Sequence, residues 1–328
     1  MGKAYYDMLF KKALDRLRFY AVGFGGYLMP RGYYRARRSE ILGQLTHDEL
    51  VAATRRAAYY CRLPEDAPSV RLSCSIGELT VPYRKQRRFP TYFFDLYSIL
   101  RYFPDNLRFD HVPGDIRRPM PTPTFVKSRP ITDTATNSTI LKLDSLRHYQ
   151  WADADPLHFD EKLDMIVSRN QADQQWRQEF LSKYIDHPRC DIGHTARHPI
   201  PGHPEWSKEF LSIAEHLKFK FISCIEGWDV ATNLKWVMSS RSLAVMPRPK
   251  CESWFAEGLL EGGVQFVEIA DDYSDLIEKL DYYASRPRQA EEIIENAHRY
   301  IAPFRNQRLE LATQLLTAER YFSLTGQL

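Results

Sequence analysis

The chain lacks any run of about 18 apolar residues, the length that a helix needs to cross a membrane. Charged residues interrupt positions 7–18, which argues against the apolar core of a secretory signal peptide. The five cysteines are scattered and form no CxxC pair. These absences argue against a structural zinc site and predict a reduced, cytoplasmic protein.

A glycine-rich phosphate loop is also lacking. The run GFGG at 23–26 follows a helical pattern instead of a strand, so it does not have the context of a phosphate loop. Internal repeats and low-complexity tracts are absent as well. With 328 residues, of which 44% are hydrophobic and 27% charged, the chain has the composition of a globular protein and room for two domains.

The net charge of +3 is unevenly spread, because the first sixty residues hold eleven Lys and Arg against five Asp and Glu. Apolar residues at helical spacing over 5–22 predict a basic amphipathic helix, which packs on the core or lies on a membrane surface. Basic clusters at 31–38 and 84–88 fit a solvated face, or contact with anionic lipid, an acidic glycan or nucleic acid.

The apolar pattern predicts an α/β fold. A helix is expected at 46–61, with Thr46 as its cap. The first half also predicts strands at 69–76, 91–99 and 108–113, and a proline-rich segment at 117–125 that is a connector or an ordered loop over a site. The second half predicts strands at 162–168, 219–225, 242–247 and 264–269, helices at 172–185, 207–218, 230–240, 252–259, 273–285, 288–304 and 307–322, and a His- and Pro-rich loop at 187–204. Such alternation indicates βαβ units and a parallel sheet.

The stretch EGWDVATN, residues 226–233, lies where a buried strand passes into a predicted helix. Doubly wound sheets bind their ligands at the carboxyl ends of strands. Gly227 permits a tight turn, Asp229 or Thr232 can cap the helix, and the helix N-terminus suits a phosphate group. Glu226 and Asp229 are better suited to accept hydrogen bonds from sugar or ribose hydroxyl groups. An ordinary capped helix is the alternative interpretation.

A longer segment, HLKFKFISCIEGWDVATNLKWVMSSRSLAVMPRPKCESWFAEGLLEGGVQFVEIADDYSDL, resembles the C-terminal half of glycosyltransferase family 90, and most closely the bacterial, lipopolysaccharide-modifying branch. Five blocks match in order and spacing, among them the strand that ends in EG, the helix that ends in LKW and the final strand before YSDL. The resemblance implies two Rossmann-like domains that face a cleft, an arrangement called GT-B. We expect an acceptor-side domain at 1–125, a donor domain at 126–302, and a last helix at 303–328 that packs back on the first domain.

The resemblance also implies site residues. IVSRNQADQQWRQEF matches the family's segment with two arginines, which places Arg169 and Arg177 at the donor diphosphate, although Asn170 stands where the family usually has glycine. Asp191 matches an acid that follows this block. PTPTFVKSRPI places Lys127 and Ser128 at the donor.

GDIRRP points to Asp115 as the catalytic base that removes the proton of the acceptor hydroxyl, with Asp95 and Asp110 as alternatives. Lys235, one turn into the predicted helix, can neutralise a diphosphate. Eukaryotic members carry an arginine where this chain has Asn233, so the arginines or Lys235 must supply the charge, or the donor differs.

Glu252 or Glu257, on the predicted helix at 252–259, is expected to hold the ribose hydroxyl groups, or else to be an ordinary solvent-facing charge. Two further patterns imitate metal sites. Asp153 and Asp155 form a DxD pattern but follow no hydrophobic strand, so we interpret them as a surface loop. Four histidines near Cys190, namely His187, His194, His198 and His203, match no standard zinc spacing, and we expect no metal.

The sequence thus predicts an inverting, metal-independent glycosyltransferase without a bound cofactor. Its donor is a nucleoside-diphosphate sugar, expected to be a UDP-sugar, and its acceptor is a cell-envelope glycan such as the lipopolysaccharide core. The basic N-terminal region would hold it on the inner membrane surface, and no nucleic acid is expected. The alternative is a degenerate, non-catalytic domain that binds membranes or nucleic acid.

Overall fold

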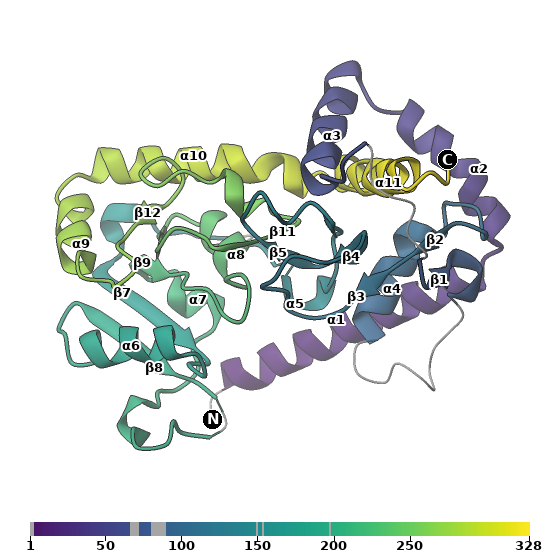
Figure 1. Cartoon of the computed structure of the whole chain (residues 1–328). Coiled ribbons are helices and arrows are strands. Elements are labelled where there is room, and N and C mark those ends of the chain that lie inside the picture. The colour runs from purple at the N-terminus through teal and green to yellow at the C-terminus, as the bar shows by residue number, and fades with distance from the viewer. Residues whose placement is uncertain (1–2, 66–71, 80–89, 149, 153, 197) are drawn as a thin grey trace. The chain divides into compact units, whose positions relative to one another are not determined.

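The computed structural model describes residues 3–65, 72–79, 90–148, 150–152, 154–196 and 198–328 (Figure 1). The basic cluster predicted at 84–88 and Asp153 lie outside the described residues. The chain forms two compact units. Unit 1 comprises Met1–Leu9, His148–Pro249 and Leu259–Ala302, and unit 2 comprises Phe10–Arg147, Lys250–Gly258 and Pro303–Leu328.

Unit 1 is built on a five-stranded parallel sheet. Its strands are β7 (Leu163–Asn170), β8 (Cys190–His194), β9 (Phe219–Ser223), β10 (Leu243–Met246) and β12 (Val267–Glu268). They lie in the order β12-β10-β9-β7-β8, and each neighbouring pair is parallel. In chain order the sheet therefore reads 2-1-3-4-5, the doubly wound order in which the connections leave β7 in one direction and β9 in the other.

Helices cover this sheet. They are α6 (Gln175–Tyr184), α7 (Ile213–His216), α8 (Leu234–Met238), α9 (Leu276–Ala284) and α10 (Pro287–Arg305), with short 3-10 turns at Phe159–Glu161 and Pro204–Trp206. Ile166, Phe221 and Val245, which share one face of the sheet, belong to one buried cluster with residues of α6, α9 and α10. Strands buried in this way read as apolar runs, which is why four of the five were predictable.

Unit 2 is mostly helical around small sheets. Its helices are α1 (Lys3–Leu28), which begins in unit 1, α2 (Arg31–Gly43), α3 (His47–Tyr60), α4 (Pro90–Leu100), α5 (Ser145–His148) and α11 (Gln307–Leu324). Its strands are β1 (Cys74–Ser75), β2 (Arg108–Phe109), β3 (His111–Val112), β4 (Thr124–Val126), β5 (Ser128–Pro130), β6 (Ser138–Ile140) and β11 (Cys251–Ser253), with 3-10 turns at Ile76–Glu78 and Glu257–Leu259. Strands β3, β4 and β6 form a parallel sheet, whereas β5 pairs with β11 and β1 with β2 in antiparallel fashion.

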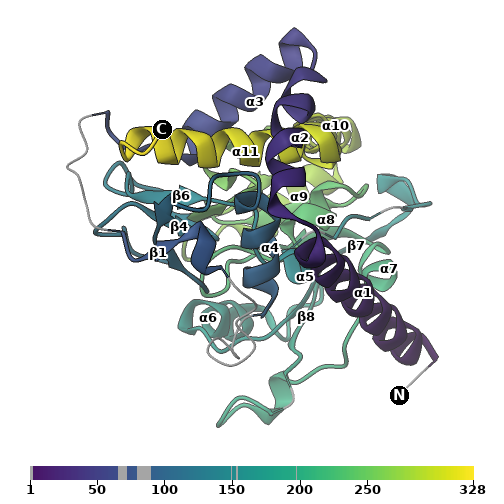
Figure 2. The ribbon, with the colours of Figure 1, turned by 90° about the vertical axis from the view of Figure 1, so that its right-hand side faces the viewer.

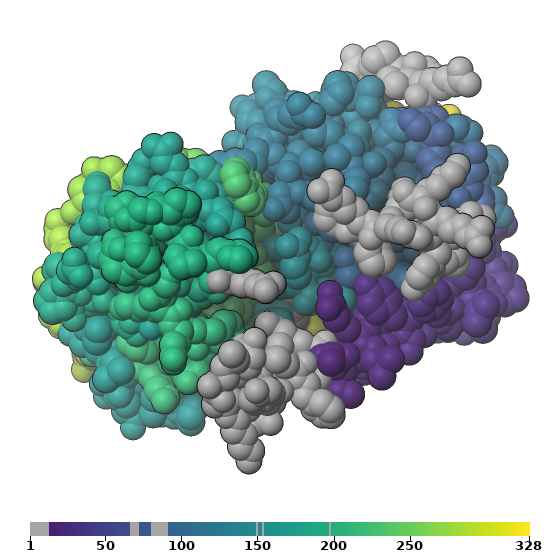
Figure 3. All heavy atoms as spheres, turned by 90° about the horizontal axis from the view of Figure 1, so that it is seen from below, coloured from purple at the N-terminus to yellow at the C-terminus, as the bar shows by residue number. Residues whose placement is uncertain are grey.

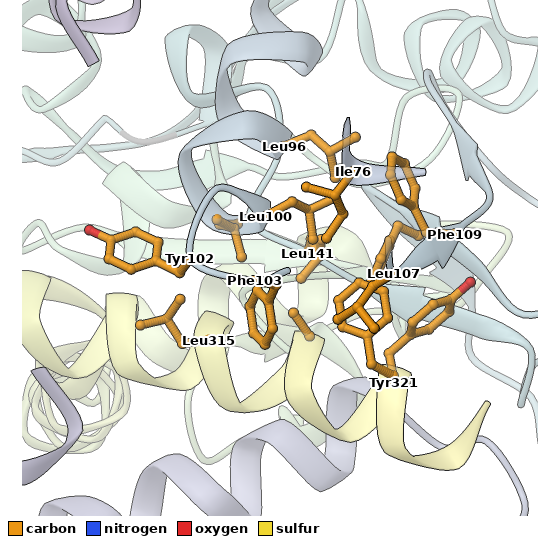
Figure 4. Packing of buried hydrophobic residues seen from close by; sticks show 14 of the residues in the cluster. Ile76, Leu96, Leu100, Tyr102, Phe103, Leu107, Phe109, Leu141, Leu315 and Tyr321 are labelled. Atoms are coloured by element: carbon orange, nitrogen blue, oxygen red, sulfur yellow. The ribbon is translucent and has the colours of Figure 1, made fainter. Parts of the chain in front are cut away.

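The core of unit 2 lies between α11, α4 and the strands. Leu315 and Tyr321 of α11 point toward Phe103 and Leu107, and Leu100 of α4 joins the same cluster (Figure 4). Helix α11 also packs along α3 (Figure 2). The predicted cap of α3 is confirmed, because the Thr46 hydroxyl accepts the Glu49 N–H at 3.2 Å while the Glu49 carboxylate accepts the Thr46 N–H at 3.0 Å.

The α/β fold with parallel sheets is confirmed, but several local predictions are wrong. Residues 91–99 form helix α4 instead of a strand. Tyr92 to Tyr97 are all buried, so this helix has no polar face and its aromatic residues imitate a strand. The loop predicted at 187–204 contains strand β8, and the helix predicted at 252–259 is strand β11 followed by a 3-10 turn. The GT-B arrangement and the domain ranges stay predictions.

Two other predicted helices are much shorter than expected. Helix α7 covers only four of the residues 207–218, because Ser212 caps it and the segment before it is irregular. Helix α8 covers five of the residues 230–240, because Asp229 to Asn233 form bends and turns.

The glycines of GFGG lie inside α1, so they do not form a phosphate loop, and Gly23 permits a close approach to Phe94 of α4. A Cβ atom added to Gly23 would lie 2.7 Å from the Phe94 ring, whereas one added to Gly25 would meet no atom within 4 Å. The same helix therefore offers one glycine that is required by packing and one that is not.

We predict that Gly23→Ala destabilises the fold by about 1–3 kcal/mol because the ring of Phe94 must move. Gly25→Ala should stabilise it by about 0.5–1 kcal/mol, since alanine loses less backbone entropy in a helix. Urea unfolding of both variants measures the difference. Equal stabilities of the two variants would contradict this packing.

Candidate functional site

The carboxyl ends of β7 and β9 mark the point of unit 1 where ligands of doubly wound sheets bind. The two strands are neighbours, with Ile166 opposite Phe221. The loop that follows β7 begins at Gln171, and the loop that follows β9 begins at Cys224. Both loops therefore start at the same edge of the sheet. The predicted residues Glu226, Gly227 and Asp229 lie on the second loop.

Arg177, in the first turn of α6, ties these two loops together. Its Nη1 donates to the Gln171 carbonyl at 2.8 Å, in the loop after β7. Its Nη2 donates to the Ile225 carbonyl at 2.7 Å and its Nε to the Glu226 carbonyl at 3.0 Å, both in the loop after β9. These three bonds use three of the five N–H donors of a guanidinium group.

The charge of Arg177 is not neutralised by an ion pair, because none of the described carboxylates lies within 4.0 Å of it. Burial lowers the pKa of Arg177 to about 10, although the nearby Tyr273, Asp173 and Glu226 act in the opposite direction. An anion that binds beside such a cation stabilises its charged form, because the attraction between the two charges offsets the cost of removing the cation from water. Arg177 is thus suited to a phosphate group.

Gly227 lies against this guanidinium, and a Cβ atom added to it would be 3.4 Å from Nη2 of Arg177. The Glu226 carbonyl also accepts the indole N–H of Trp176 at 2.9 Å. Sequence reasoning did not select Trp176, although it directly precedes Arg177 on the helix.

Asn233 and the residues around it hold the end of β9. The Asn233 amide donates to the Ser223 carbonyl at 2.8 Å. Asp229 is buried, with 3% of its surface exposed, whereas Thr232 is exposed. The side chain of Asn233 is therefore used within the loop.

The helix predicted after this loop is much shorter than expected, and a phosphate site at its N-terminus stays a prediction. Helix α8 has only five residues, and so few aligned peptide groups give a small dipole. Lys235 lies within α8 and is completely buried. In this conformation its ammonium group is not at the surface where a diphosphate would bind.

Arg169 lies apart from Arg177. Successive residues of a strand point to opposite faces, so the side chain of Arg169 lies on the other face of the sheet from those of Ser168 and Asn170. Its Nη2 donates to both carboxylate oxygens of Asp191 at 2.8 and 2.9 Å, and the group also donates to the Asp191 and Glu209 carbonyls. Its fifth donor reaches the Ser168 carbonyl. With every donor used, Arg169 has a structural place, and its role at the donor stays a prediction.

A small hollow opens beside Arg177. It is lined by Ser168, Asn170, Ala172, Arg177, Phe180, Leu181, Gly193 and Ile225. The Asn170 amide donates to the Ser168 hydroxyl at 2.7 Å, so this departure from the family pattern is accommodated within the hollow. Close by, the buried His194 accepts the Ala172 N–H at 3.0 Å and links the loops after β7 and β8.

In unit 2, three predicted residues come together. The turn before Asp115 contains Gly114 with a φ of 101°, which favours glycine. Lys127 is buried, and its Nζ lies 2.5 Å from Oδ1 of Asp115. The Ser128 hydroxyl accepts the N–H of Ile116 at 3.3 Å and so holds the same turn. Asp115 itself is exposed, as a residue that meets a substrate must be.

The two alternative bases have structural partners. Asp110 accepts the Ser73 N–H at 2.8 Å. Asp95 lies in α4, is buried, and accepts the Ser145 N–H at 2.8 Å, which caps α5. Burial raises the pKa of Asp95 to about 7. The geometry therefore favours Asp115 as the residue open to a substrate.

Glu252 and Glu257 are not on a solvent-facing helix. Glu252 lies in β11 without exposed surface, opposite Arg129 of β5, whose Nε donates to it at 2.8 Å. The Tyr59 hydroxyl donates to the same carboxylate. Glu257 is buried and accepts the Ser253 N–H at 2.6 Å. Both carboxylates serve the packing of unit 2, so ribose binding by either stays a prediction.

The patterns that imitate metal sites have other partners. Asp155 lies in a loop as expected, but its carboxylate is bound by the buried Lys162 at 2.8 Å. The imidazole of His203 stacks on Trp206 with 3.8 Å between ring centres. Among the described residues, no group of three or more His, Cys, Asp or Glu side chains is arranged to hold a metal ion.

Doubly wound sheets bind nucleotides and related ligands at the switch point, and an arginine such as the half-buried Arg177 is suited to pair with a phosphate group there. Comparison with known proteins narrows this class. The model of Glycosyl transferase family 90 matches residues 189–309. The O-glucosyltransferase LpsA of Dichelobacter nodosus is 41% identical over 262 residues, which cover 80% of this chain and 78% of that protein. The chain belongs to glycosyltransferase family 90 and is a glycosyltransferase.

Asp95 generates a prediction about pH. Its pKa is about 7 in the fold and near 3.8 in the unfolded chain, so the folded state binds the proton more tightly and stability falls as pH rises from 4 to 7. Asp95→Asn keeps an acceptor for Ser145 but cannot ionise. The difference in unfolding free energy between the variant and the wild type should therefore rise in favour of the variant by about 1 kcal/mol per pH unit between pH 5 and pH 7.

Chemical unfolding at several pH values measures this difference. The exposed Asp133→Asn is the matched control and should run parallel to the wild type. If the Asp95→Asn profile is also parallel to the wild type, Asp95 does not carry the raised pKa.

Proposed function

We propose that this glycosyltransferase moves a sugar from a UDP-sugar to a hydroxyl group of a cell-envelope glycan such as the lipopolysaccharide core, with inversion at the anomeric carbon and without a metal ion. The observation that supports the proposed donor is the guanidinium of Arg177, which lies between the loops after β7 and β9 and forms no ion pair with any of the described carboxylates. The name of the relative, an O-glucosyltransferase, supports glucose as the sugar.

The proposed reaction is a single displacement. Asp115 removes the proton of the acceptor hydroxyl, and the oxygen attacks the anomeric carbon as the bond to the diphosphate breaks. The leaving diphosphate takes the bonding electron pair, and Arg177 stabilises its charge. Lys127 and Ser128, which contact Asp115 and its turn, hold the base in place.

The donor is tested by a thermal-shift screen with UDP, GDP, ADP, CMP and dTDP, each with and without EDTA. A ligand of the native state raises the melting temperature by mass action. We expect a selective shift with UDP that EDTA does not change. Arg177→Ala should lose most of this shift, whereas the exposed Arg288→Ala should keep it; no shift of the wild type with any nucleotide would contradict the proposal.

Asp115→Asn separates chemistry from binding. We predict that it lowers transfer by at least about 100-fold, because the amide cannot accept the proton, while the UDP shift stays unchanged. Release of UDP in the presence of donor and acceptor measures transfer. Asp110→Asn is the control, and full activity of Asp115→Asn would show that the base lies elsewhere.

We also propose that the N-terminal region binds an anionic membrane surface. Phe19, Tyr20, Phe24 and Tyr27 pack toward Phe93, Phe94 and Tyr97, whereas other side chains of the region are exposed. Large apolar residues are exposed there, namely Leu14, Leu17, Val22, Leu28, Met29 and Tyr33. Arg16 and Arg18 are also exposed, and the N-terminal region is purple in Figure 3. Exposed leucines next to arginines suit a lipid headgroup layer.

None of the described helices is long and apolar enough to cross a bilayer. Vesicle sedimentation tests the proposed surface. We predict that the protein sediments with vesicles that contain anionic lipid and less with neutral vesicles, and that Leu17→Ser with Leu28→Ser reduces this binding several-fold. Leu50→Ser with Val51→Ser, a pair of exposed apolar residues on α3, should not. Equal sedimentation of both double variants would contradict the proposed membrane-binding surface. If the surface instead mediates self-association, light scattering would detect the larger particles.

A further inference from the structure

Trp228 is a large apolar side chain at the surface of the proposed donor site. It leaves 55% of its surface exposed, whereas Trp206, Trp236 and Trp254 are buried. A buried indole ring stabilises a protein core or an interface, and an exposed ring does not provide this stabilisation. Its position directly after Gly227 places it at the carboxyl end of β9.

A neighbouring indole ring supports the ring of Trp228. Trp228 lies edge-to-face with Trp176, with 6.2 Å between ring centres and an angle of 85° between the planes. Trp176 is itself fixed by its bond to the Glu226 carbonyl at 2.9 Å. A supported ring loses little conformational freedom when a flat ligand covers it, which suits a binding platform.

The platform is adjacent to the cation. Gly227, the neighbour of Trp228, lies against the guanidinium of Arg177, and Glu226 accepts from both Trp176 and Arg177. One short stretch of chain thus joins an exposed aromatic face to a positive charge. A nucleoside diphosphate presents the complementary pair, a flat base and an anionic diphosphate.

We propose that Trp228 stacks on the nucleobase of the donor and is the residue that holds the base. The inference rests on the proposed function, since it assumes a nucleoside-diphosphate donor at Arg177. Stacking of a base on an aromatic side chain is worth about 1–3 kcal/mol, and every base has a face to offer. Trp228 therefore supplies affinity for the nucleotide, and it takes no part in the bond-making step.

The experiment measures binding of UDP, UMP, pyrophosphate and glucose 1-phosphate by titration calorimetry. Trp228→Ala should weaken UDP and UMP by about 5- to 100-fold and leave pyrophosphate within about two-fold. Trp228→Phe, which keeps a flat ring, should recover most of the loss. Tyr282→Ala removes a similarly exposed aromatic residue of α9 and is the control.

Kinetics give a second readout. Because stacking contributes to donor binding equally before and during the reaction, Trp228→Ala should raise the KM for the donor while kcat stays within about two-fold. A residue that only supported the loop would lower kcat and pyrophosphate binding together.

Three results overturn the inference. Unchanged UDP affinity of Trp228→Ala excludes base stacking while the proposed donor stands. A loss shared by pyrophosphate shows a structural role, and a loss confined to glucose 1-phosphate shows a platform for sugar. Failure of the wild type to bind any nucleoside diphosphate is a different result, because it removes the proposed function itself.

Discussion

The three bonds from Arg177 to the carbonyl groups of Gln171, Ile225 and Glu226 are the interaction on which the candidate donor site depends. A parallel sheet sends its loops outward at the switch point, where nothing in the sheet itself holds them together. One guanidinium spans both loops and keeps two donors in reserve. The group that holds the two loops together can therefore also bind an anion. In this account, loss of Arg177 would weaken both the loops and the binding of a diphosphate.

Unit 2 depends on a buried ion pair. Arg129 and Glu252 are directly opposite each other in β5 and β11, and both side chains are completely buried. Breaking one partner of such a pair leaves an uncompensated buried charge, which is strongly destabilising. This pair explains why Lys250–Gly258 belongs to unit 2, and why Glu252 is better explained as an anchor than as a ligand for ribose.

Local chemistry made much of the fold predictable, whereas tertiary surroundings decided the rest. The apolar runs of β7, β9 and β10 and the capping box at Thr46 follow from neighbouring residues alone. Helix α4 could not be predicted, because burial on every side removed its periodicity. In the site, the rule of strand ends located the loop of Gly227, but family resemblance could not separate Arg169 from Arg177. Their positions in the fold separate them, since Arg169 lies within strand β7 and Arg177 lies on helix α6, which follows it.

The central claim is that the nucleotide binds at the switch point of unit 1. Hydrogen exchange measured by mass spectrometry, with and without saturating UDP, tests it most directly, because bound ligand slows the opening of the loops that it contacts. The account predicts slower exchange in peptides that cover 170–177 and 224–233, and little change in α9 and α10. Unchanged exchange in both loops, with protection confined to unit 2, would contradict it.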